Sequence, residues 1–104
     1  MSTENLSRFE EDPYLFQIKK IIFHYFDSDT GIVLFGSRAS GDESLNSDYD
    51  IAIISRSKNI MKKISRVKEE LENSNIPYKV DVLDYYSTTG LLRKEISRGI
   101  KWNA

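Results

Sequence analysis

The sequence of 104 residues has no cysteine, only two prolines and one histidine, and no long apolar run. Without cysteine the chain has no disulfide scaffold, no thiolate metal site and no thiol nucleophile. The one histidine, His24, falls on the expected solvent face of a helix, and a serine–histidine–aspartate site would have no other histidine to use. The longest apolar runs, such as residues 32–35 and 51–54, are far shorter than the roughly 20 residues that cross a bilayer. We therefore expect no membrane span.

Neither sign of charge is in excess, because 15 Lys and Arg residues stand against 16 Asp and Glu residues. A protein that binds nucleic acid over a broad surface needs a basic stripe, so we expect no extensive nucleic-acid binding. Residues 1–11 lack the basic start and apolar centre of a secretory signal, and a cytoplasmic location is the default expectation. The length predicts one domain over residues 12–104, after a flexible tail over residues 1–11.

Helical and strand patterns alternate along the chain. Asp12 and Pro13 are typical of a helix start, and apolar residues recur on one helical face as far as Phe26. Turn formers then precede an uninterrupted apolar run at residues 32–35, which is typical of a strand covered on both faces. The later patterns predict strands over residues 48–54 and 78–84, a helix over residues 60–71, and a last helix capped by Ser87, ended by Gly99 and followed by a short extended tail at residues 100–102.

The connection between the first two strands begins Gly36-Ser37-Arg38-Ala39-Ser40-Gly41. A glycine directly after a buried strand lets the backbone turn sharply and approach a ligand closely. A short helix after it would direct free N–H groups and the Ser37 hydroxyl at an anion such as a phosphate. The hexapeptide is not a P-loop, because no Lys-Ser or Lys-Thr pair closes it. An ordinary strand-to-helix turn is the simpler interpretation of this segment alone.

Asp48 and Asp50 stand at the start of the second strand. Side chains at i and i+2 of a strand point to the same face, so the two carboxylates converge. At about 4 Å two such charges repel by roughly 4 kcal/mol at an effective dielectric of 20. A hard cation, Mg²⁺ or Mn²⁺, would relieve that repulsion. Taken alone, the pair is equally well explained as polar turn residues before a strand.

Asp81 interrupts the third apolar strand, where an unpaired charge is expensive to bury, and so it needs a partner or a function. By alternation Asp81 shares a face with Leu83, whereas Asp84 lies on the opposite face and is expected to be a solvent-facing strand end. A short connection allows the first two strands to be antiparallel, and the helical connection suits a parallel second and third strand. In that topology Ser37, Asp48, Asp50 and Asp81 share one crevice.

Two further features have two interpretations each. The basic run of residues 56–68 is the solvated face of a helix, balanced by later glutamates, or a docking patch for an acidic partner. Tyr85, Tyr86 and Trp102 are packing or rim residues, or anchors for a partner.

Gly36-Ser37, a spacer of ten residues, Asp48-x-Asp50 and the later strand residue Asp81 resemble the signature of the nucleotidyltransferase superfamily of DNA polymerase beta. The resemblance extends from Asp12 to Trp102 and is strongest to the minimal nucleotidyltransferases of bacteria and archaea. One departure is Ser40, where many relatives carry a basic residue. The resemblance implies an α/β (α+β) nucleotidyltransferase fold, with a small mixed sheet of three main strands flanked by helices.

The resemblance also implies Mg²⁺-dependent transfer of a nucleoside monophosphate, AMP from ATP, with loss of pyrophosphate. Asp48, Asp50 and Asp81 would be the catalytic ligands of two Mg²⁺ ions, with Mn²⁺ as a substitute. Gly36 and Ser37 would bind the β- and γ-phosphates, with Arg38 as an electrostatic helper. The family's small members are commonly paired with a helical HEPN protein, so the implied role is an antitoxin that adenylylates its HEPN toxin, in a homo- or hetero-oligomer.

Two alternatives stay open. The chain could be a module without catalytic activity that binds a nucleotide and neutralises its partner by occlusion, or a nucleotidyltransferase acting on a small molecule such as an aminoglycoside. A carboxylate inside a strand, as at Asp81, favours the enzyme over the binding module.

Overall fold

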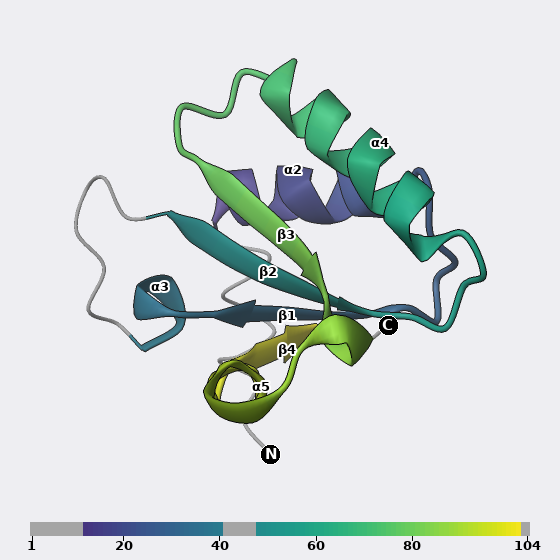
Figure 1. Ribbon diagram of the computed structural model, residues 1–104. Coiled ribbons are helices and arrows are strands. Elements are labelled where there is room, and N and C mark those ends of the chain that lie inside the picture. Colours follow the sequence, from purple (N-terminus) through teal and green to yellow (C-terminus); the bar gives the residue numbers. More distant parts are fainter. Residues whose placement is uncertain (1–11, 41–47, 103–104) are drawn as a thin grey trace.

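The computed structural model describes residues 12–40 and 48–102, which form one mixed sheet with helices on both faces (Figure 1). The predicted tail over residues 1–11 and most of the spacer before Asp48 lie outside the described residues. The elements are, in order, α2 (Pro13–Ile22), β1 (Gly31–Phe35), α3 (Ser37–Ser40), β2 (Tyr49–Ile54), α4 (Ile60–Glu72), β3 (Val80–Asp84), the 3-10 turn η1 (Tyr85–Ser87), α5 (Gly90–Ser97) and β4 (Ile100–Trp102).

The strands lie in the order β3-β2-β1-β4. β1 and β2 are antiparallel, and β2 and β3 are parallel, which confirms the predicted topology. Within the described residues, however, the sheet has four strands, where the sequence predicted three main strands. The expected extended tail at residues 100–102 is β4, which pairs antiparallel with β1, with Ile32 opposite Trp102. Pairing with a central strand makes these three residues the second edge of the sheet.

Alternation along the strands divides the core into two parts. Ile32, Ile51 and Val82 point to the face covered by α2 and α4, where most of the buried side chains gather. Val33 and Ala52 point to the other face, where a smaller cluster forms around Ile96 of α5. Figure 1 shows α2 and α4 together on one side of the sheet and α5 on the other. Since α5 has only eight residues, it covers less of its face of the sheet than α2 and α4 cover of the other face.

The start of α2 follows from its cap. One carboxylate oxygen of Asp12 accepts hydrogen bonds from the N–H groups of Tyr14 and Leu15, at 2.9 and 3.2 Å, and Pro13 occupies the first helical turn. The helix ends at Ile22, earlier than the apolar spacing predicted. Phe26 is still buried because the chain turns back against the core after the helix.

His24 therefore lies just beyond α2 and not on its solvent face. The side chain is exposed, and its Nδ1 lies 3.0 Å from a carboxylate oxygen of Glu70 on α4. The expectation of an exposed histidine is confirmed, while the expected helical position is wrong.

The last helix begins two residues later than predicted. Ser87 does not cap it, because the Ser87 hydroxyl donates to the Asp84 carboxylate at 2.8 Å and belongs to η1. Thr89 stands at the N-cap position of α5. After the helix, Gly99 packs so closely on β1 that a Cβ there would collide with the carbonyl oxygen of Leu34. This contact ties the end of α5 to the end of β1. No helix in the part of the chain that the structure describes is long and apolar enough to span a bilayer.

Candidate functional site

The turn after β1 is built around Gly36. Its φ of +81° lies in the left-handed region, which glycine adopts without the steric cost that a Cβ brings. A Cβ at this position would also collide with the carboxylate of Asp50. The close approach arises because Phe35, the last residue of β1, is the register partner of Asp50 on β2. The predicted glycine turn is confirmed, and it lies directly against one of the candidate aspartates.

Asp50 and Asp81 are register partners on the parallel strands β2 and β3. Paired residues of neighbouring strands point to the same face of a sheet. Both aspartates therefore lie on the α5 side, the side of Ala52 and Leu83. The sequence pattern predicted this shared face. Near α5 this face of the sheet carries apolar side chains, and at Asp50 and Asp81 it carries carboxylates.

The pKa of Asp50 is affected by the acids that lie near it. Burial is the main cause that raises the pKa of the Asp50 carboxyl above its ordinary value, and the negative charges of Asp81, Asp48 and Glu95 raise this pKa further. Lys79 acts in the opposite direction. Asp48, the exposed residue just before β2, therefore faces the same negative region as Asp50 and Asp81.

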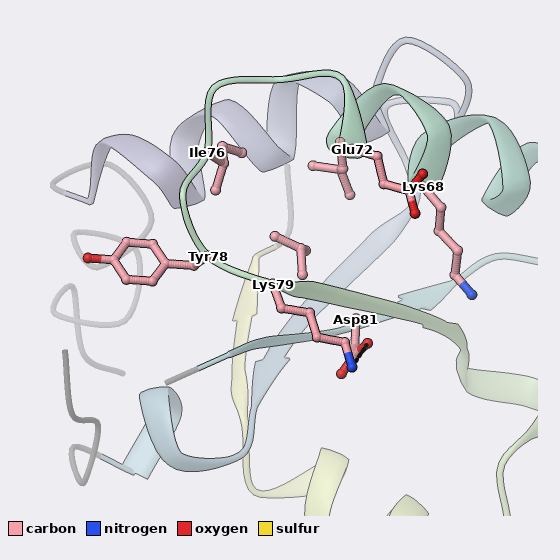
Figure 2. Close-up of a pocket in the computed structure, with 8 residues that line it drawn as sticks. Lys68, Glu72, Ile76, Tyr78, Lys79 and Asp81 are labelled. Carbon is pink, nitrogen blue, oxygen red and sulfur yellow. Dashed lines mark ion pairs between the residues drawn. The ribbon is translucent and has the colours of Figure 1, made fainter. Parts of the chain in front are cut away.

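Asp81 and Asp84 have separate roles, as the alternation predicted. Asp81 is half exposed, and its carboxylate lies 3.8 Å from the Lys79 ammonium, an ion pair drawn in Figure 2. Asp84 was expected to be a solvent-facing strand end. It is half-buried instead, and it caps η1 by accepting hydrogen bonds from the N–H of Tyr86 and the hydroxyl of Ser87. Asp84 thus has a structural function, which leaves Asp81 as the candidate on β3.

The donor set fits a hard divalent cation in its chemistry. Asp48, Asp50 and Asp81 supply only carboxylate oxygens, the ligands that Mg²⁺ and Mn²⁺ prefer. A cation would also relieve the like-charge repulsion that raises the pKa of Asp50. Across residues 12–40 and 48–102, however, no three His, Cys, Asp or Glu side chains are already arranged to hold a metal ion. The aspartates share one region without forming a ready-made ligand cage.

A cavity of about 250 Å³ opens beside the glycine turn, and it brings in two residues that the sequence analysis did not select. Gly36 and Ser37 line this cavity together with Glu95, near the end of α5, and Arg98, the residue that follows α5. Glu95 and Arg98 are three residues apart, a spacing that places both on one face of a helix. That spacing is visible in the sequence, but the direction of this face depends on how α5 lies across the sheet.

Arg38 is placed away from this cavity. Its guanidinium stacks 4.0 Å from the ring centroid of Tyr49 and 4.7 Å from that of Tyr78. Tyr49 is fully buried and points to the α2 and α4 side, opposite to its neighbour Asp50. The structure therefore brings Gly36, Asp50 and Asp81 together, with Ser37 next to them, and holds Arg38 over the aromatic rings behind the turn.

These features match a known family over most of the chain. The family model described as polymerase beta, nucleotidyltransferase, matches residues 17–101. The chain belongs to this nucleotidyltransferase family. The mixed sheet is thus its version of the family fold, and the resemblance seen in the sequence is confirmed.

Known relatives agree with this assignment. The chain is 35% identical over 81 residues to the probable protein adenylyltransferase MntA of Haemophilus influenzae, an alignment covering 78% of this chain and 71% of that protein. A crystal structure of a toxin–antitoxin with AMP-PNP aligns with a TM-score of 0.61 at 26% identity, over 85% of this chain and 72% of that one. A variant of the toxin–antitoxin MntA–HpeT shares the fold, with a TM-score of 0.66 at 24% identity over the same shares of the two chains. This nucleotidyltransferase is therefore a homologue of a probable protein adenylyltransferase.

Proposed function

We propose that this nucleotidyltransferase transfers AMP from ATP to a hydroxyl group of a partner protein, as the antitoxin of a toxin–antitoxin pair. The observation that carries the proposal is the contact of the Gly36 turn with Asp50, which lies beside Asp81 on the same face of the sheet. This arrangement puts a backbone turn suited to phosphates next to carboxylates suited to the reacting end of the nucleotide. The relatives support the proposal, because one is named a probable protein adenylyltransferase and another was solved with AMP-PNP.

In this proposal the chain's own groups bind and orient the nucleotide. Gly36 and Ser37 receive the β- and γ-phosphates in the cavity that they share with Arg98, whose guanidinium supplies a cation. Arg38, held over the rings of Tyr49 and Tyr78, adds positive charge behind the turn. Asp48 and Asp50 would hold Mg²⁺, and Asp81 would hold the ion next to the acceptor. When bound, the two ions would stabilise negative charge on the attacking and leaving oxygens.

The transfer exchanges one phosphorus–oxygen bond for another. The acceptor oxygen forms a bond to the α-phosphorus, and the bond from that phosphorus to the oxygen bridging to the β-phosphate breaks. Pyrophosphate leaves, and the acceptor proton passes to a carboxylate of the site, for which Asp81 is the candidate because it lies at the exposed edge of the aspartate group. We further propose that the acceptor protein is a helical HEPN toxin, which is what the resemblance to the minimal nucleotidyltransferases, commonly paired with such proteins, implies.

The experiment is to incubate the protein with ATP, Mg²⁺ and the HEPN partner and to weigh both chains intact. We expect the partner to gain one adenylyl group, and Asp48→Asn to abolish the gain. Asp29→Asn, which changes an exposed turn residue before β1, at the opposite end of that strand from Gly36, is the matched control and should leave the gain unchanged. Neutralisation of the partner without a change in mass, and unaffected by Asp48→Asn, would instead make this chain a module that acts by occlusion.

A further inference from the structure

Arg38 follows the Gly36 turn but faces away from the cavity beside it. The described residues that line this cavity include its two chain neighbours, Ser37 and Ala39, but not Arg38. The Arg38 guanidinium stacks instead on two tyrosine rings behind the turn, those of Tyr49 and Tyr78. A guanidinium is a planar cation, and it is attracted to the electron-rich face of an aromatic ring. One arginine is therefore held by two rings at once.

The two rings are fixed to the sheet. Tyr49, the first residue of β2, is fully buried, and its N–H donates to the carbonyl oxygen of Lys79 at 2.9 Å. Tyr78 lies two residues before β3 and packs on the core under α2 and α4, with its ring directed away from Lys79 and Asp81 (Figure 2). The two rings meet edge to face, with their centroids 6.0 Å apart. An arginine stacked on both is anchored to the starts of two neighbouring strands.

Asp12 favours the stack from the far side of Tyr49. The Tyr49 hydroxyl donates a hydrogen bond of 2.9 Å to the Asp12 carboxylate. Hydrogen-bonded groups polarise one another, so a phenol that donates to a carboxylate gains electron density on its ring. The ring then attracts the Arg38 cation more strongly than the ring of an unbonded phenol would. Contacts thus continue from the cap of α2 through Tyr49 to Arg38 in α3.

α3 needs an anchor because it is short. The helix has four residues, Ser37–Ser40, and the turn before it closes with a hydrogen bond of 3.1 Å from the Ala39 N–H to the Gly36 carbonyl oxygen. A single helical turn is not stable by itself, because fixing its backbone costs more free energy than its few hydrogen bonds supply. Tertiary contacts must therefore hold this segment in place, and Arg38 supplies them on the side away from the cavity.

We propose that Arg38 is a positioning residue, which forms a clamp with Tyr49 and Tyr78 and so holds the Gly36 turn in the conformation that binds the triphosphate. This inference rests on the proposed function for the identity of the ligand. To the positive charge of Arg38 it adds a mechanical role, and it makes the affinity for the nucleotide depend on Tyr78. A lysine would supply the same charge, whereas the clamp needs a planar guanidinium and the faces of the rings.

The first test needs no nucleotide. Hydrogen exchange of the Ala39 amide, followed by NMR, measures how often the turn opens. Arg38→Lys and Tyr78→Leu should each speed this exchange about fivefold, and the double variant should exchange no faster than the faster single variant. Tyr78→Phe keeps the ring and should exchange like the wild type. Tyr14→Leu is the matched control and should also be unchanged, because it removes a ring that meets Tyr78 edge to face at 5.5 Å but leaves both rings at Arg38 in place.

The second test is calorimetric titration of the same variants with AMP-PNP and Mg²⁺. We expect Arg38→Lys and Tyr78→Leu to weaken binding about fivefold, with no further loss in the double variant, because both changes open the same clamp. Tyr78→Phe and Tyr14→Leu should bind like the wild type. The melting temperature of each variant is measured alongside, since a tyrosine that only packs in the core would lower it without changing the affinity or the exchange of Ala39.

Three results would overturn the clamp. The first is unchanged exchange of Ala39 in Tyr78→Leu, which would show that the ring does not hold the turn. The others are a loss of affinity confined to Arg38→Lys and additive losses in the double variant, either of which would place Arg38 in direct contact with the phosphates. If the wild type did not bind AMP-PNP, the proposed function would be wrong, and the exchange of Ala39 would still decide whether the clamp holds the turn.

Discussion

At the scale of single residues, two features of the structure require glycine at position 36. The backbone of Gly36 has a left-handed φ, and the carboxylate of Asp50 occupies the space that a Cβ would need. Gly36→Ala should destabilise the fold by roughly 2 kcal/mol or more, since the positive φ alone costs about 1–2 kcal/mol for an L residue. Gly90→Ala is the matched control, with a φ of +59° and nothing within 4 Å of the added Cβ. Urea unfolding of the two variants measures the difference, and equal losses would mean that the contact with Asp50 has no energetic weight.

The raised pKa of Asp50 gives a dependence of stability on pH. The folded protein binds the Asp50 proton more tightly than the unfolded chain does, so ionisation of this carboxyl opposes folding. The free energy of unfolding begins to fall as pH rises through 3.8, the ordinary pKa of this carboxyl. The fall is complete once pH is above the raised pKa of the folded protein. Asp50→Asn, which cannot ionise, should therefore be more stable than the wild type at pH 7, and the advantage should shrink as pH falls towards 3.8.

Thermal unfolding from pH 3 to pH 8 measures this dependence. Asp29→Asn, at an exposed turn, serves as the reference variant. An Asp50→Asn variant that is less stable than the wild type at pH 7 would contradict the account in which burial, and then the neighbouring acids, raise the pKa of Asp50.

At the scale of elements, the start of α2 is linked to the core of the sheet through Asp12. One oxygen of Asp12 caps the helix, and the other accepts a hydrogen bond of 2.9 Å from the hydroxyl of Tyr49. Burial, and then this bond, raise the pKa of Tyr49 above its usual value, so the hydroxyl remains a donor. Asp12→Ala should cost about 1–2 kcal/mol of stability and Tyr49→Phe about 1 kcal/mol.

A double-mutant cycle measures the link between the two residues. The combined loss should be smaller than the sum of the two single losses by about 0.5–1 kcal/mol, because the same hydrogen bond is removed in both variants. Tyr25→Phe removes a comparable bond, from Tyr25 to Glu70, elsewhere in the protein and should be additive with Asp12→Ala. If the losses of stability in Asp12→Ala and Tyr49→Phe were additive, the hydrogen bond between the two residues would not couple the cap of α2 to the sheet.

Elements with strong local patterns were predicted well from the sequence, and their ends less so. Asp12 and Pro13 gave the start of α2 because a cap needs only neighbouring residues. Its end was misplaced because Phe26 keeps the apolar spacing although the chain has already left the helix. Ser87 was chosen as a cap by residue type, but Asp84 engages its hydroxyl. β4, with three residues, carries too little pattern to be recognised as a strand before its pairing is seen.

At the scale of the whole molecule, the candidate site was predictable to the extent that it follows from strand alternation and connection length. These two patterns place Asp50 and Asp81 on one face of the sheet and the turn at Gly36 beside them, as found. Glu95 and Arg98 were missed because their position depends on how α5 lies against the second face. Their roles, and those of the aspartates, stay predictions that only nucleotide binding can test.

That test is calorimetric titration of the protein with AMP-PNP, an ATP analogue, with and without Mg²⁺. We expect one site per chain whose affinity rises at least tenfold with Mg²⁺, and an Asp50→Asn variant that loses this dependence while Asp29→Asn keeps it. Because a ligand at 100 times its dissociation constant stabilises the native state by about 2.7 kcal/mol, the same samples should melt at a higher temperature. Binding that does not depend on Mg²⁺ and is equal in Asp50→Asn would contradict the assignment of these carboxylates to the nucleotide's metal ions.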